Sequence, residues 1–298
     1  MPPGPWAAAL TFAFGLVVGS FLNVVIARVP AGQSIVSPGS RCPRCGHALA
    51  WFENVPLLSW IALGARCRAC RAPISPRYPL VELLTGCLFL GCWVRFGASW
   101  ELLRGLLLVS FLVPLTFIDL DHWVLPFELT VPGLGAGLLS ALLLGWPEAL
   151  ASAVGAAVAF LFFFCLERLV RWLLGKEGLG AGDKWLGALL GAYLGWRPLF
   201  GLVLLSNVQG AIVGGALLLA RGHAGPAGPR PAVAGEAPDA PAPAGEGEPA
   251  DDWSPGPTHL PFGPWLALAA LELLLLGPLI HHLLPPALAT LLTGRLGE

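Results

Sequence analysis

Two aspartates, Asp119 and Asp183, each stand where a long apolar segment meets a polar break. Either acid can be explained as an interfacial side chain, and the Gly-Ala-Gly turn before Asp183 also suits a helix cap. Two carboxylates that meet cannot both ionise cheaply, so they share a proton and supply a base and an acid together. If Asp119 and Asp183 converge, they form the catalytic pair of a protease that activates water.

Other catalytic signatures are missing from the sequence. It contains no Gly-x-Ser-x-Gly, His-Glu-x-x-His or Walker motif. Serine hydrolases, metalloproteases of the His-Glu-x-x-His type and ATPases are therefore disfavoured. A carboxylate pair needs neither a metal nor a covalent nucleophile, so it is consistent with these absences.

Four of the seven cysteines form two Cys-x-x-Cys pairs, Cys42 with Cys45 and Cys67 with Cys70. Four thiolates from two such turns can surround zinc tetrahedrally, and disulfides are disfavoured in the cytosol. We therefore predict a structural zinc site that folds a small module; a redox pair is the alternative. The remaining three cysteines lie in apolar segments and are expected to be buried small hydrophobes.

Several polar residues near these motifs allow two interpretations. His47 is either a fifth candidate ligand of the metal or a solvated turn histidine. Glu53 and Asn54 either line a site at the membrane face or cap a turn. Glu82 lies inside an apolar segment, where an acid is costly unless it faces protein or a polar cavity. It is expected either to bind a ligand or to pair with a buried arginine such as Arg104.

The composition requires a membrane protein. The chain has 298 residues, of which 56% are hydrophobic and 12% are charged, and its mean hydropathy is +0.73. We predict an all-α polytopic membrane protein with about eight transmembrane helices. The first apolar stretch is long enough to anchor the chain, so no cleavable signal peptide is expected. Seven clear spans are predicted near residues 6–29, 79–95, 102–118, 129–146, 148–166, 199–220 and 262–285. The short Gly-rich segment at 185–196 is either a weak eighth span or a re-entrant piece, and a full short span suits the topology better.

The charged loops predict the topology. Seven arginines and no lysine lie between Arg28 and Arg77, so this loop should be cytoplasmic and the N-terminus outside. Counting spans then places Asp119 and Asp183 on the cytoplasmic face together. The predicted organisation is a first helix at 1–29, a cytoplasmic four-cysteine module at 30–77, a membrane peptidase domain at 78–220, a disordered Ala/Pro/Gly-rich cytoplasmic loop at 221–259, and a last helix and tail at 260–298.

These features together resemble the bacterial type IV prepilin peptidases, the bifunctional leader peptidase and N-methyltransferase family of membrane aspartic proteases. The resemblance covers nearly the whole chain and includes both cysteine pairs. The matching segments are GSFLNVVIARVP at 19–30, FENVPLLSW at 52–60, RYPLVELLTG at 77–86, FIDLDHWVLP at 117–126, Gly-x-Gly-Asp at 180–183 and PFGPWLALA at 261–269.

The resemblance implies that Asp119 and Asp183 are the catalytic pair, with Asp121 a neighbour. It implies that the substrate is a prepilin or pseudopilin of a type IV pilus or type II secretion system. Its short basic leader would be removed at the cytoplasmic face of the inner membrane. The new N-terminus would be methylated with S-adenosylmethionine, an activity associated with the four-cysteine module. Membrane lipid is the other expected partner, and nucleic acid is not expected.

One departure from the family pattern concerns a third acid. The family commonly has Leu-Pro-Asp after the first catalytic aspartate, whereas this chain reads Leu125-Pro126-Phe127-Glu128. That acid is therefore missing or displaced by one residue. A peptidase without methylation is the alternative function, and a membrane transporter is a further one, since intramembrane acids and short Gly-rich helices also occur there.

Overall fold

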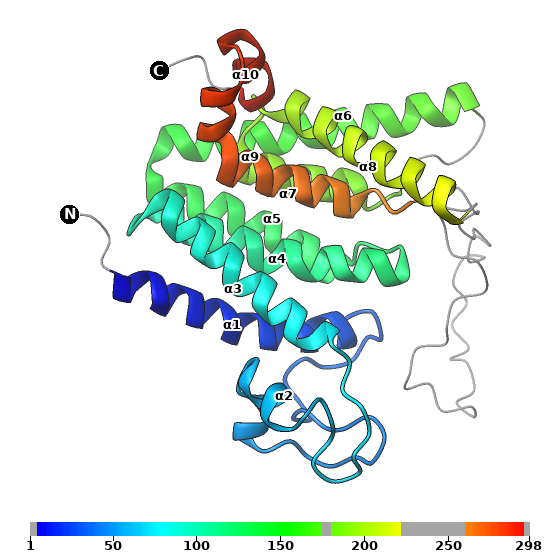
Figure 1. Ribbon diagram of the computed structural model, residues 1–298. Coiled ribbons are helices and arrows are strands. Elements are labelled where there is room, and N and C mark those ends of the chain that lie inside the picture. Colours follow the sequence, from blue (N-terminus) through cyan, green and yellow to red (C-terminus); the bar gives the residue numbers. More distant parts are fainter. Residues whose placement is uncertain (1–4, 175–179, 222–259, 295–298) are drawn as a thin grey trace.

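The computed structural model describes residues 5–174, 180–221 and 260–294, and within them every regular element is a helix. Seven of these helices are long and apolar enough to cross a membrane, which confirms the polytopic all-α prediction (Figure 1). The helices are α1 (Pro5–Arg28), α2 (Leu58–Ala62), α3 (Arg77–Phe96), α4 (Trp100–His122), α5 (Phe127–Ala141), α6 (Trp146–Leu174), α7 (Asp183–Leu194), α8 (Leu199–Arg221), α9 (Gly263–Leu283) and α10 (Pro286–Thr293), with short 3₁₀ turns η1 (Trp51–Asn54) and η2 (Leu142–Leu144).

The short Gly-rich segment forms α7, which is not among the seven helices long enough to span. Its 12 residues extend roughly 18 Å, well short of hydrocarbon about 30 Å thick. Helix α7 packs chiefly between α5 and α6. Its glycines permit close approach, because a Cβ on Gly187 would meet the ring of Phe163 and one on Gly191 would meet the backbone of Gly155. Small residues at four-residue spacing are typical of tightly packed membrane helices.

The N-terminal helices α1 and α3 form a second close pair. Gly15 and Gly19 of α1 face α3, where a Cβ on either would lie 2.8 Å from a Cα atom of Gly86 or Glu82. The Asn23 side chain of α1 donates a hydrogen bond to the Tyr78 carbonyl oxygen at 3.1 Å. This pair carries the four-cysteine module, which lies below it in Figure 1.

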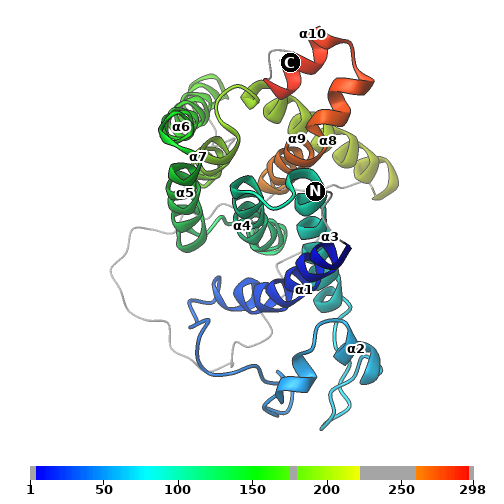
Figure 2. The same cartoon turned by 90° about the vertical axis from the view of Figure 1, so that its left-hand side faces the viewer.

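Helix α4 joins the two halves of the protein. It packs against α1 and α3 on one side and against α5 and α9 on the other, as the turned view of Figure 2 shows. Its side chains accordingly belong to both hydrophobic cores: Val109 and Ile118 to the one with α1 and α3, and Leu112 and Leu115 to the one with α7 and α9. The position of Asp119 at the end of α4 is thereby fixed from several directions.

The C-terminal part differs from the predicted single helix and tail. Helix α9 ends at Leu283, before the Pro285-Pro286 pair, and the separate helix α10 follows. His281 and Thr293 make a hydrogen bond of 2.6 Å that joins the two helices. The predicted loop at 221–259 falls, apart from its first residue, outside the described residues.

Candidate active site

Asp119 lies in the last turn of α4, and its carboxylate is buried. Its exposed fraction is 5%, and its Oδ2 accepts a hydrogen bond of 3.1 Å from the N–H of Gly263. The turn ends because Trp123 adopts a left-handed conformation, from which its N–H donates to the carbonyl oxygen of Asp119. The first residue of α9 thus holds the Asp119 side chain through a backbone donor.

Gly263 leaves no room for a side chain beside Asp119. A Cβ at this position would lie 2.5 Å from the Asp119 Oδ2 and 3.3 Å from Leu125 Cδ2. Gly263 belongs to the matching segment at 261–269, but its residue type alone predicts no catalytic role. The available signal was a glycine between Phe262 and Pro264 at the start of a predicted helix, which indicates close approach of the backbone to another group.

Asp183 is the first residue of α7 and is also buried, with 5% of its surface exposed. Its Oδ2 accepts a hydrogen bond of 3.0 Å from the N–H of Gly180, and its own N–H donates to the Gly180 carbonyl oxygen at 3.0 Å. The N-cap residue is Gly182, which makes no side-chain cap. The helix-cap interpretation of Asp183 is therefore wrong: its carboxylate faces back toward the glycine turn.

Leu125 packs between the two aspartate-bearing segments. Gly182 has an ordinary φ of −76°, so it is not needed for an unusual backbone conformation. A Cβ on Gly182 would instead lie 2.7 Å from Leu125 Cβ. Leu125 is buried, and its Cδ2 atom would also contact a Cβ added to Gly263. The glycine therefore allows the start of α7 to approach the loop that follows Asp119.

The structure brings Asp119 and Asp183 together. Both carboxylates are buried, and the same side chain, Leu125, lies beside Gly263, which contacts Asp119, and beside Gly182, which precedes Asp183. Lys184 does not neutralise the pair, because its Nζ binds Glu167 of α6 at 2.8 Å. Two buried acids in each other's field are suited to share a proton, with one acting as base and the other as acid.

Asp121 has a different environment. Its exposed side chain forms an ion pair of 2.6 Å with Arg77, whose guanidinium also donates to the Phe117 carbonyl oxygen and lies over the Phe117 ring. Asp121 thus connects α4 to the start of α3. Glu128 is exposed on α5, so it does not replace the family's third acid in this buried site.

Glu82 and Arg104 do not pair with each other. Glu82 accepts a hydrogen bond of 2.8 Å from the N–H of Leu57, the residue that precedes α2. It therefore attaches the four-cysteine module to α3. Arg104 donates to the carbonyl oxygens of Ala192 and Tyr193 at 2.9 and 3.2 Å, where α7 ends. A cation at a helix C-terminus is electrostatically favourable.

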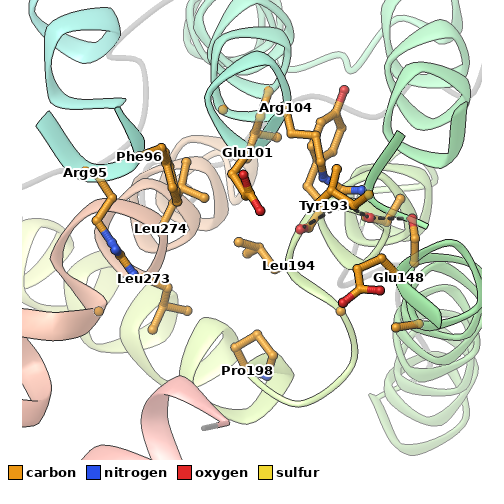
Figure 3. A pocket seen from close by; sticks show the side chains of 18 of the residues that line it. Arg95, Phe96, Glu101, Arg104, Glu148, Tyr193, Leu194, Pro198, Leu273 and Leu274 are labelled. Carbon is orange, nitrogen blue, oxygen red and sulfur yellow. Dashed lines mark hydrogen bonds between the residues drawn. The ribbon is translucent and has the colours of Figure 1, made fainter. Parts of the chain in front are cut away.

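A cavity of about 290 Å³ with several charged lining residues lies at the opposite ends of α4 and α7 from the aspartates (Figure 3). Glu101 and Glu148 point toward it from the starts of α4 and α6, and Arg95 approaches from the end of α3. Neither Asp119 nor Asp183 lines this cavity. The cavity is therefore separate from the candidate active site.

The four cysteines form one cluster with the geometry of a metal site. All four sulfur atoms lie within 4.8 Å of one another, with Cys42 to Cys70 at 3.8 Å and Cys45 to Cys67 at 4.0 Å. Four thiolates at about 2.3 Å from a tetrahedral zinc lie about 3.8 Å from one another. The donor set and the spacing therefore fit zinc.

Each cysteine pair sits in a similar turn. The N–H of Cys42 donates to His47 O, and that of Cys67 donates to Ala72 O, five residues on in both cases. Backbone N–H groups of Cys45 and Arg44 lower the pKa of Cys42 to about 6. Those of Cys70 and Ala69 lower the pKa of Cys67. These backbone donors therefore favour the thiolate form of the first cysteine in each turn, which is the form that binds a metal.

His47 and Glu53 support the module without joining the cysteine cluster. His47 Nε2 lies 3.3 Å from Glu53 Oε2, which also accepts the N–H of Ala50 at 2.8 Å. The hydrogen bond from the Ala50 N–H lowers the pKa of the Glu53 carboxyl, and His47 and the positive charge of Arg68 lower it further. Glu53 therefore caps η1, whereas Asn54 is exposed.

Known proteins and protein families match nearly the whole length of this chain. Residues 13–96 match the bacterial peptidase A24 N-terminal domain, and residues 106–215 match the type IV leader peptidase family. The chain is 51% identical to a prepilin leader peptidase/N-methyltransferase of Myxococcus xanthus, covering 98% of this chain and 96% of that protein. Proteins of the same name from Aeromonas hydrophila and Pseudomonas aeruginosa are 43% and 40% identical, covering 78% and 76% of this chain and 90% and 87% of theirs. No solved structure matches.

These matches include both the cysteine module and the segments that carry the two buried aspartates. Together with the spanning helices, they identify a multi-pass protein of the bacterial inner membrane. This chain is a member of the type IV leader peptidase family.

Proposed function

We propose that this protein removes the leader peptide of prepilins or pseudopilins, with Asp119 and Asp183 as its catalytic pair. The observation that carries the proposal is the convergence of two buried carboxylates, each held by a backbone N–H, at one end of the bundle. The names of the relatives support the reaction and the substrate class.

The geometry suits water activation. One carboxylate of the pair takes a proton from water, which attacks the carbonyl carbon of the scissile peptide bond. The other, protonated, donates to the carbonyl oxygen. The proton taken from water then passes to the departing amine as the C–N bond breaks, and the tetrahedral intermediate returns a proton to the second carboxylate as the new carboxyl group forms. The N–H groups of Gly263 and Gly180 keep both carboxylates oriented through these steps. Burial excludes bulk water and strengthens the interaction of the pair with the developing charge.

The active site is proposed to face the cytoplasm. The four-cysteine module with its arginines follows α1, and Arg77 at its end pairs with Asp121, two residues from Asp119. An arginine-rich loop is retained in the cytoplasm, so the module and the aspartates should share that side. The basic leader of a substrate would then remain in water while its scissile bond reaches the membrane surface.

The second proposed activity is N-methylation of the new N-terminus with S-adenosylmethionine as donor. The relatives' names support it, and we assign it to the module at 30–77, with 78–220 as the peptidase domain. Zinc would be bound by Cys42, Cys45, Cys67 and Cys70, and its four-thiolate shell has no open position, so its contribution is structural. No residue is assigned to binding the methyl donor.

Mass analysis of one reaction tests both activities. Purified protein is given a prepilin with and without S-adenosylmethionine. We expect loss of the leader in both reactions and a methyl increment only when S-adenosylmethionine is present. Cleavage with no methyl increment in the presence of S-adenosylmethionine would restrict the protein to proteolysis. An intact substrate in both reactions would refute the peptidase proposal.

A further inference from the structure

A second cavity, of about 310 Å³, opens between α3, α4 and α9. Its walls are apolar almost throughout and include Leu84 and Leu88 of α3, Val113 and Phe117 of α4, and Ala267 and Leu271 of α9. Leu84 and Leu268, which both line the cavity, are 39% and 42% exposed. We call this cavity the α3/α4/α9 groove; it faces the surrounding membrane.

The groove ends beside the candidate active site. Thr116, which lines it, is three residues before Asp119 and therefore lies on the same face of α4. Pro264, which also lines it, directly follows Gly263, the residue whose N–H binds Asp119 Oδ2. Any segment that lies in the groove therefore approaches the catalytic carboxylate at one end.

The dimensions and chemistry of the groove define its occupant. From Pro264 to Leu276 it follows about three turns of α9, roughly 18 Å, which is more than half of the hydrocarbon thickness. A peptide at this depth must be apolar and must satisfy its backbone hydrogen bonds internally, so it must be helical. A basic leader cannot enter such a site.

We propose that the α3/α4/α9 groove binds an apolar helix of the substrate on the C-terminal side of the scissile bond. This inference rests on the proposed peptidase function and adds how the substrate is held. The leader extends into water while the helix lies against Phe117 and Ala267. The chain between them passes Asp119, so docking of the helix brings the scissile bond to the catalytic pair.

Photocrosslinking tests the occupant directly. A photoreactive p-benzoylphenylalanine replaces Leu268 in the groove or, as control, Leu139 of α5, which is 68% exposed elsewhere on the membrane surface. Both proteins also carry Asp119→Asn to retain uncleaved substrate. The proposal expects a covalent adduct with full-length prepilin from position 268 and little from position 139. Equal yields at the two positions, or adducts with lipid alone at position 268, would overturn it.

Kinetics separate this proposal from failure of the peptidase function itself. Leu84→Trp and Leu268→Trp narrow the groove at partly exposed positions, and Leu139→Trp is the matched control. For full-length prepilin we expect kcat/KM to fall about tenfold or more in the groove variants and to stay near wild type in the control. Unchanged cleavage by both groove variants, with active wild type, contradicts groove docking while leaving the peptidase assignment intact.

Discussion

The N–H of Gly263 donates to Oδ2 of Asp119 at 3.1 Å, joining the start of α9 to the end of α4. The two residues are 144 positions apart, so the last spanning helix completes the site that α4 begins. This bond leaves the other oxygen of Asp119 to act toward water or Asp183.

Gly263→Ala should impair cleavage. The added Cβ would lie 2.5 Å from Asp119 Oδ2, so either the carboxylate or α9 must move. We expect kcat to fall at least about tenfold, equivalent to about 1.4 kcal/mol of activation free energy. Gly277→Ala is the matched control in α9, because a Cβ there has open space. Equal activity of the two variants in a prepilin cleavage assay would contradict the positioning role of Gly263.

Asp121→Asn should retain activity. Asp121 makes an exposed ion pair with Arg77 at 2.6 Å, and exposed pairs contribute at most about 1 kcal/mol. We therefore expect kcat/KM for prepilin to stay within about fivefold of wild type. A loss as large as that of Asp119→Asn would show that the catalytic acid of α4 has been misassigned.

Cys42→Ser and Cys67→Ser should each abolish stoichiometric zinc binding. The four sulfur atoms lie within 4.8 Å of one another, and removing one opens the tetrahedral shell. Metal analysis should find about one zinc per wild-type chain and much less in both variants. Cys87→Ser and Cys165→Ser change exposed cysteines outside the cluster and should keep the metal. Unchanged zinc in the first two variants would refute the site.

Arg71→Gly should stabilise the zinc module. Arg71 follows Cys70 with φ of 59°, at the position that Gly46 occupies after Cys45 with φ of 70°. A left-handed conformation costs a non-glycine residue about 1 kcal/mol, so glycine should slow zinc transfer to a competing chelator by up to about fivefold. Gly46→Ala should accelerate the same transfer. Faster zinc loss from Arg71→Gly would disprove this account of the turn.

Much of the fold was predictable because membrane helices are encoded by long apolar runs. The boundaries of α1, α3, α4 and α8 differ from the predicted spans by a few residues. Helix α10 was missed because the last apolar stretch continues through the Pro285-Pro286 break. The shortness of α7 was recognised, but its burial between α5 and α6 depends on glycine contacts with distant residues.

The candidate site was predictable in its acids but not in its backbone donors. Asp119 and Asp183 stand out as charges in an apolar sequence. The partner of Asp119 is a backbone N–H, and every non-proline residue has one, so Gly263 could not be identified from residue type. The partner of Glu82 could not be predicted for the same reason, because Glu82 accepts a hydrogen bond from the backbone N–H of Leu57 and does not pair with an arginine.

The most direct test of the catalytic pair is prepilin cleavage by Asp119→Asn, Asp183→Asn and the double variant in the same detergent. Residues that act as one unit are strongly non-additive, so each single change should abolish cleavage about as completely as both together. Metal content and thermal stability of the three proteins should remain close to wild type. Full cleavage by either single variant would contradict the assignment.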